Sequence, residues 1–398
     1  MISGFKFSSS LVLCAMLLPA QTAAVRPLRT PPSEKLTVNL GFRDWGAATI
    51  SGTTLLAGNQ TGRGGVFAVD TVTGKARWSF RPVLPGGTAS VSMRPAVAGN
   101  LVITAFSTAN PGAVIAVSLA TGKEVWRGPN PEQDAGIAVS GNLAYVLSKD
   151  GNFYALDTAT GQKRWSTPFL TDLARCASEP VVREGVVYFT AIAKYDVPGA
   201  ARPYSYYLFA LDAQTGKELW RYRAEAPYVH TGVCLSQPVV TADAIYATGD
   251  NYLYGVVRVT GQNLWPPVEV RRPVEGRERG ISVSPLVDAG PVLVGISAGY
   301  LLAFSKDTGR AAWEIPGTYR DNFPATAVAG NVLYFQGSPS IKPAASASGT
   351  LHALDLDTRQ LLWSFTRPTV EPNWSFGRPV PVDSGLWVAS YQTFLKLE

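Results

Sequence analysis

The chain has 398 residues, of which 46% are hydrophobic and 16% are charged, and its 38 glycines and 29 prolines are typical of a turn-rich β protein. This composition excludes a disordered chain and a purely helical one. The formal charge of +6 comes from no basic stripe, because glutamates are interleaved in the densest run, residues 271–280, so we expect no nucleic-acid partner.

Residues 1–24 have the pattern of an export signal. Lys6 is the only charge in this segment, and an apolar run that ends in small residues follows it. We therefore expect a cleaved signal peptide, a linker over residues 25–34, and a mature protein in the periplasm, the cell envelope or the medium. An uncleaved anchor is one alternative. Lipidation of Cys14 is another, although Leu13 is larger than the residue that usually precedes a lipidated cysteine.

One repeated pattern fills the rest of the chain. An AxDxxTGxxxW frame, first seen as AVDTVTGKARW (68–78), occurs seven times, roughly every 48 residues. A period of this size with one aromatic residue per repeat predicts a β-propeller. The seven repeat tryptophans are Trp78, Trp126, Trp165, Trp220, Trp265, Trp313 and Trp363.

Strand-forming residues also lie outside the seven repeats. KLTVNL (35–40) precedes the first repeat, and residues 377–398 contain three further strand patterns. We predict that the N-terminal strand closes this last blade, because a closed ring has no free strand edges. The predicted fold is all-β: an eight-bladed β-propeller over residues 35–398 with four antiparallel strands in each blade. A seven-bladed ring with loose ends is the alternative.

The turn in each repeat has a physical explanation. An aspartate such as Asp70 is expected to accept hydrogen bonds from the following backbone in an Asx turn, and a glycine such as Gly74 to supply a positive φ angle. Three repeats replace the aspartate, which indicates a structural role and not a catalytic one. In the last repeat Arg359 replaces the glycine, so we expect a distorted turn there.

Two cysteines remain in the expected mature chain. Cys176 and Cys234 each lie four residues before a repeat proline, in consecutive blades. Equivalent positions near the axis of a propeller can approach the ~5–6 Å Cα separation of a disulfide, so we predict a Cys176–Cys234 bridge. Two small buried thiols are the alternative.

The two histidines predict no metal site. His352 lies at a strand position that aromatic residues occupy in other repeats, which favours a place in the core. His230 lies in a long loop where it could titrate or bind a metal, but the sequence has no Cys-x-x-Cys or His-x-x-x-His spacing to support a metal site.

The polar residues before the repeat prolines form the first candidate binding site, and long loops form the second. The first group is expected at the mouth of the central channel, where a polar ring could hold a small anion or an acidic side chain. A hydrated channel lining is the alternative. The loops over residues 192–205 and 222–236 carry tyrosines, which are favoured interface anchors. The candidates are Arg94, Glu179, Gln237, Ser284 and Arg378 in the ring, and Tyr195, Tyr228 and His230 in the loops.

The repeat frame resembles the tryptophan-docking motif of the pyrroloquinoline quinone (PQQ) repeat family, over residues 35–398. The resemblance implies that the seven tryptophans pack between neighbouring blades. It also implies one of two functions, that of the quinoprotein dehydrogenases or that of non-enzymatic propellers such as the BamB type of outer-membrane assembly factor. The dehydrogenases resemble one another in a vicinal Cys-Cys pair, which this sequence lacks, and in a set of Ca²⁺ ligands that we cannot place here.

We therefore predict an exported, non-catalytic binding scaffold without cofactor or metal. We expect it to act as a monomer on protein partners of the cell envelope, with peripheral membrane association at most. The alternatives are a PQQ-dependent dehydrogenase relative and a propeller that senses a small ligand or carbohydrate. GISAG (295–299) matches a serine-hydrolase motif, but it lies between two expected strands and not at the strand-to-helix turn that the motif needs.

Overall fold

The computed structural model describes most of the chain after the expected signal peptide, residues 1–24, which lies outside the described residues. Within residues 25–398, the parts left undescribed are 41–44, 60–63, 86, 88, 92–93, 108–111, 130–135, 149, 169–172, 195–203, 225–235, 250, 275–276, 284, 298, 317–325, 338–349, 368–376, 384 and 391–392. The described residues contain no helix that is long and apolar enough to cross a membrane.

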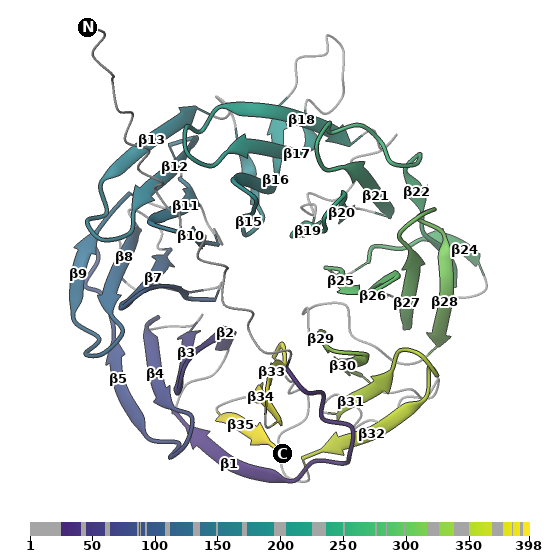
Figure 1. The fold of residues 1–398 in the computed structure, drawn as a ribbon, viewed down its shortest axis with the longest axis horizontal. Helices are drawn as coiled ribbons and strands as arrows, with labels where there is room; N and C mark the ends of the chain where they lie inside the picture. The colour runs from purple at the N-terminus through teal and green to yellow at the C-terminus, as the bar shows by residue number, and fades with distance from the viewer. Residues whose placement is uncertain are drawn as a thin grey trace, which may run out of the picture.

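Eight blades of antiparallel strands form a closed ring around a central axis (Figure 1). The second and third strands are buried on both faces, as in β3, where all six residues are buried, because neighbouring blades cover them. The prediction of an all-β, eight-bladed propeller is confirmed. We number the blades 1 to 8 along the chain from β2.

The first three blades each contain four strands. They are β2 (Trp45–Ser51), β3 (Thr54–Asn59), β4 (Val66–Asp70) and β5 (Ala76–Phe80); β6 (Ala96–Ala98), β7 (Leu101–Phe106), β8 (Ala113–Ser118) and β9 (Glu124–Arg127); and β10 (Ala138–Ser140), β11 (Leu143–Leu147), β12 (Asn152–Asp157) and β13 (Lys163–Pro168).

Blades 4 and 5 depart from this regular pattern. Blade 4 has a fifth strand, and a two-stranded hairpin follows blade 5. The strands are β14 (Leu173–Ala177), β15 (Val181–Arg183), β16 (Val186–Lys194), β17 (Tyr204–Asp212) and β18 (Glu218–Ala224) in blade 4; β19 (Val239–Val240), β20 (Ala244–Gly249), β21 (Tyr252–Val257) and β22 (Val268–Glu269) in blade 5; and β23 (Arg271–Val274) and β24 (Arg277–Gly280) in the hairpin.

The last blade joins the two ends of the chain. Its outer strand, β1 (Glu34–Asn39), pairs antiparallel with β35, so the N-terminal strand closes the ring as predicted. The remaining strands are β25 (Val287–Ala289), β26 (Val292–Ser297), β27 (Tyr300–Ser305) and β28 (Ala311–Pro316) in blade 6; β29 (Ala327–Ala329), β30 (Val332–Gln336), β31 (Thr350–Asp355) and β32 (Leu361–Thr366) in blade 7; and β33 (Val380–Val382), β34 (Gly385–Ser390) and β35 (Thr393–Leu397) in blade 8.

The repeat tryptophans join neighbouring blades. The indole Nε1 of Trp126 donates a 2.8 Å hydrogen bond to the carbonyl of Thr158 in the next blade, and five other repeat indoles also donate to backbone carbonyls. Five of the tryptophans cover a turn glycine of the next blade: a Cβ at Gly161 would lie 2.5 Å from Trp126. Trp313 packs against a cluster that includes Leu354 of the next blade. The predicted packing between blades is therefore confirmed.

The repeat aspartates form the predicted Asx turns. One carboxylate oxygen of Asp70 accepts hydrogen bonds from the backbone N–H groups of Val72 and Thr73, at 3.0 and 2.8 Å. Asp157, Asp212 and Asp355 accept the equivalent pair of bonds in their own turns.

The expectation of a distorted turn at Arg359 is wrong. Arg359 adopts a φ of 61°, close to the 69° of Gly309 at the corresponding position of blade 6. Its N–H donates to the carbonyl of Asp355 at 2.8 Å, as Gly74 does to Asp70. The hydrogen bonds of the turn thus keep a non-glycine residue in the left-handed region, at a cost of about 1 kcal/mol.

We expect Arg359→Gly to raise the free energy of unfolding by about 0.5 kcal/mol, because relief of the left-handed strain exceeds the added chain entropy of glycine. Urea unfolding measures the change. The matched control is Gly309→Arg, which should destabilise the protein because a Cβ at Gly309 would lie 2.7 Å from the ring of Trp265. A less stable Arg359→Gly protein would contradict this explanation.

The outer strand of blade 8 comes from the other end of the chain, so no turn connects it to β35. The segment before β1 takes the place of that turn. Trp363 donates to the carbonyl of Leu28 at 2.9 Å, where the other tryptophans meet a repeat turn. The N–H of Leu28 in turn donates to the Tyr334 hydroxyl at 2.6 Å. Backbone bonds of 2.8 and 3.1 Å between Ser33 and Glu398 replace those that close the other turns. Residues 25–33, expected as a linker, thus contact blades 7 and 8 directly.

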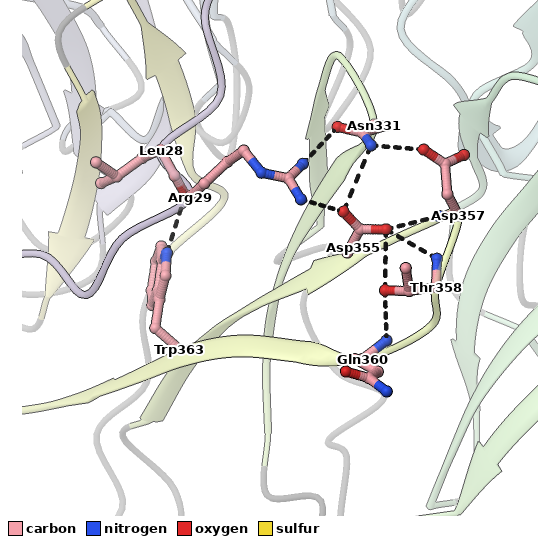
Figure 2. A network of polar contacts seen from close by, with 8 residues as sticks. All are labelled: Leu28, Arg29, Asn331, Asp355, Asp357, Thr358, Gln360 and Trp363. Atoms are coloured by element: carbon pink, nitrogen blue, oxygen red, sulfur yellow. Dashed lines mark hydrogen bonds and ion pairs between the residues drawn. The ribbon is translucent and has the colours of Figure 1, made fainter.

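An ion pair also binds the segment before β1 to blade 7. In blades 1 and 3 the repeat aspartate binds an arginine of its own blade, Arg77 or Arg164, but Leu362 stands at that position in blade 7. Arg29 supplies the missing cation by binding the carboxylate of Asp355 (Figure 2). The N–H of Thr358 and the guanidinium of Arg29 lower the pKa of Asp355 to about 2.

Candidate functional site

Three of the predicted ring residues lie close to the axis of the ring and influence one another electrostatically. Arg94, Glu179 and Arg378 each lie two residues before the innermost strand of a blade, namely blades 2, 4 and 8. The innermost strands surround the axis (Figure 1), so residues from separate blades can approach one another there. The Nε of Arg94 donates to a carboxylate oxygen of Glu179 at 2.7 Å. We call these three residues the mouth cluster.

A glycine in blade 3 makes this contact possible. Gly136 precedes β10 and lies between Arg94 and Glu179 in the order of blades. A Cβ at Gly136 would lie 2.4 Å from the Cβ of Glu179 and 2.5 Å from its Cγ, so any side chain there would displace Glu179. The sequence alone did not point to this residue, although matching GIAVSGN (136–142) to RPAVAGN (94–100) would have placed Gly136 opposite Arg94.

The mouth cluster combines two positive charges with one negative charge, and Glu179 is its buried member. The side chain of Glu179 is 11% exposed and that of Arg94 is 44% exposed. Burial raises the pKa of the Glu179 carboxyl, and the charges of Arg94 and Arg378 oppose this rise. Burial also lowers the pKa of the Arg378 guanidinium, and the like charge of Arg94 adds to that effect. Arginine nevertheless stays charged in proteins, so the cluster keeps a positive excess when Glu179 is ionised.

The other predicted site residues are not brought together with these three in the described structure. Gln237 is half-buried at the start of blade 5. Ser284, Tyr195, Tyr228 and His230 lie outside the described residues. Cys234 does too, and of Cys176 only the backbone is described, in β14, so the disulfide stays a prediction.

The remaining histidine belongs to the core, as predicted. His352 is 2% exposed, and its Nδ1 lies 2.8 Å from the hydroxyl of Ser364. Its Nε2 contacts the carbonyl of Gly337, and its ring stacks on Phe335. Burial lowers the pKa of His352, which favours the neutral ring.

The described residues do not fit a calcium-bound PQQ. Among them, no three His, Cys, Asp or Glu side chains lie together as a metal-binding group. Glu179, the carboxylate of the mouth cluster, is bound to Arg94. The vicinal cysteine pair that the dehydrogenases share is absent from the sequence. We therefore derive no chemistry through this cofactor.

The repeats match a known family. A family model described as "Outer membrane protein assembly factor BamB" matches residues 29–193, 110–265 and 200–341, which together cover more than half of the chain. The chain belongs to this BamB family of PQQ-like repeat propellers. The resemblance inferred from the tryptophan frame is thereby confirmed.

Relatives of two functional kinds share the repeats of the BamB family. Quinohemoprotein alcohol dehydrogenase ADH IIB of Pseudomonas putida is 28% identical over 277 residues, which are 63% of this chain and 38% of that protein. Outer membrane protein assembly factor BamB of Yersinia pestis is 27% identical over 238 residues, 56% of each protein. The chain thus spans less than two thirds of the length of these relatives.

Solved structures show the same fold. BamB from Moraxella catarrhalis has a TM-score of 0.64 and 16% identity, over 92% of this chain and 99% of that chain. Quinohemoprotein alcohol dehydrogenase from Comamonas testosteroni has the same score and identity, over 92% of this chain and 76% of that chain. At this identity the likeness extends to the propeller alone.

Proposed function

We propose that this protein is a non-catalytic scaffold of the cell envelope that binds a protein partner at the channel mouth. The observation that carries the proposal is the set of contacts that the Glu179 carboxylate makes. This carboxylate accepts a hydrogen bond from Arg94 and lies within the electrostatic influence of Arg378, so Glu179 is part of a network of charged groups. Such a cluster is suited to recognition, because charged groups at an interface select partners by electrostatic complementarity.

The family supports an envelope location and a protein partner. Two of the matched relatives are outer membrane protein assembly factors, from Yersinia pestis and Nitrosomonas eutropha. The expected export signal over residues 1–24 agrees with this location. On this proposal the protein acts as a monomer, with the rigid ring presenting its mouth and the neighbouring loops to the partner.

Site-directed cross-linking in cells tests the scaffold function. A photoreactive residue at Gln237, which is half-buried at the mouth, should link to one reproducible envelope protein. The matched control is the same residue at Gln162, an exposed turn residue between β12 and β13, which should give no link to that protein. Equal labelling from the two positions, or none from Gln237, would contradict the proposal; mass spectrometry identifies the partner.

A quinoprotein relative is the second candidate, because ADH IIB matches more of this chain than BamB of Yersinia pestis does. Titration of the purified protein with PQQ and Ca²⁺, followed by tryptophan fluorescence, separates the two functions. Saturable quenching that requires both would favour the enzyme, and no quenching would favour the scaffold.

A further inference from the structure

Arg378 is a charged group without hydrogen-bonded partners. In the part of the chain that the structure describes, its guanidinium makes no hydrogen bond and no ion pair, although it lies close enough to Arg94 and Glu179 to influence both. A guanidinium carries five N–H donors in a planar fork. A partly buried guanidinium without a hydrogen-bond partner costs free energy in the folded protein. The arrangement around Arg378 therefore points to a ligand that binds its unused donors.

The charges show what kind of ligand would complete the cluster. Arg94 uses its Nε to bind Glu179, and its side chain is 44% exposed, so its terminal nitrogens can take a further acceptor. One carboxylate therefore lies near two guanidinium groups, and the positive excess equals one unit charge when Glu179 is ionised. A monoanion neutralises that excess. The resident carboxylate of Glu179 also shows that the space beside Arg94 accepts the shape of a carboxylate.

We propose that Arg94 and Arg378 bind one carboxylate group at the channel mouth. The inference deepens the proposed function, because it states the chemistry that a partner must present there. The planar fork of each arginine matches the two oxygens of a carboxylate, and such charge-assisted pairs are stronger than neutral hydrogen bonds. The carboxylate comes either from a free small acid or from an acidic side chain of a protein.

Calorimetry on the purified protein, residues 25–398, tests the site with propionate at constant ionic strength. Propionate should bind with one-to-one stoichiometry, and propionamide, its neutral isostere, should not bind. Arg378→Gln should weaken propionate binding about tenfold or more, because it removes the charge and the fork. The matched control is Arg183→Gln, since Arg183 pairs with Glu184 outside the mouth cluster. Equal affinity of Arg378→Gln and wild type would overturn the proposal.

A second variant keeps the test decisive if Arg378→Gln folds poorly. Glu179→Gln removes the resident carboxylate that competes for Arg94, so it should bind propionate more tightly than wild type does. If the contact between Arg94 and Glu179 only stabilised the fold, its removal would weaken propionate binding instead. Weaker binding by a folded Glu179→Gln protein would therefore contradict the site.

The pH dependence gives a further readout. Burial raises the pKa of Glu179, while Arg94 and Arg378 stay charged. When pH falls through this raised pKa, Glu179 loses its negative charge and the mouth cluster becomes more positive. Methanesulfonate, which stays ionised, should bind wild type more tightly at the lower pH. Its affinity for Glu179→Gln should stay constant over the same range.

Two peptides distinguish the sources of the carboxylate. Acetyl-Ala-Glu-Ala-amide and its glutamine counterpart differ only in the charged group. Tighter binding of the glutamate peptide than of propionate assigns the site to a protein side chain, and binding of propionate alone assigns it to a small acid. Binding of neither the peptide nor propionate would overturn the inference. The scaffold function is tested separately, because it fails if Gln237 gives no cross-link.

Discussion

Removal of residues 25–39 should leave a chain that does not fold at 25 °C. This change deletes β1 and leaves the outer edge of β35 unpaired. It also removes Val38, which is 4% exposed, and the carbonyl of Leu28 that Trp363 binds. About five backbone hydrogen bonds and two apolar side chains together contribute about 8 kcal/mol, which is comparable with the whole stability of a typical domain.

Circular dichroism and urea unfolding of the fragment 40–398 measure the effect. A synthetic peptide of residues 25–40 should restore cooperative unfolding when it is added in excess, because it supplies β1 and the contacts of Arg29. The same peptide with Val38→Asp should fail to do so. A fragment that unfolds at the wild-type urea concentration without any peptide would show that the ring does not depend on this strand.

Trp126→Ala should lower the free energy of unfolding by about 4 kcal/mol, which is typical of a large buried aromatic residue replaced by alanine. Trp126 is 8% exposed and joins blade 2 to blade 3 through Gly161 and the carbonyl of Thr158. Its removal leaves a cavity between blades and an unpaired carbonyl. Urea unfolding measures the loss.

Two comparisons isolate the causes of that loss. Trp126→Phe keeps most of the ring but loses the Nε1 donor, so it should cost about 1–2 kcal/mol. Val83→Ala, at a side chain that is 89% exposed, should change the stability by less than about 0.5 kcal/mol. A loss below about 1 kcal/mol for Trp126→Ala would contradict the role of the indole between blades.

The repeat made most of the fold predictable. A fixed frame that ends in tryptophan predicts the blade, its turn and its docking residue together, because one local pattern recurs seven times. The spare strand before the first repeat and the three strand patterns after the last repeat then predicted closure by β1. Arg359 could not be predicted in the same way, because the hydrogen bonds of its turn outweigh the preference of arginine for negative φ.

The candidate site was predicted only in part. The position of Arg94, Glu179 and Arg378 directly before a repeat proline predicted that they lie near the axis. The contact between Arg94 and Glu179 depends on Gly136, and the absence of a side chain at this residue gave no signal in the sequence. The role of Arg29 was missed because its partner Asp355 lies 326 residues later in the sequence. Such pairs depend on the closed ring and not on any local pattern.

Closure by β1 also has a consequence for how the chain reaches its final state. Among the strands of the ring, the ribosome makes β1 first and its partner β35 last, so β1 has no partner until the other blades have been made. Until then an incomplete ring exposes the inner face of blade 1 and a free edge, the features that lead nascent chains to aggregate. Two crowded chains can satisfy that edge by exchanging β1, because the strand of one molecule fits the last blade of another. The same join that stabilises the finished ring thus makes the unfinished chain dependent on dilution or on a chaperone.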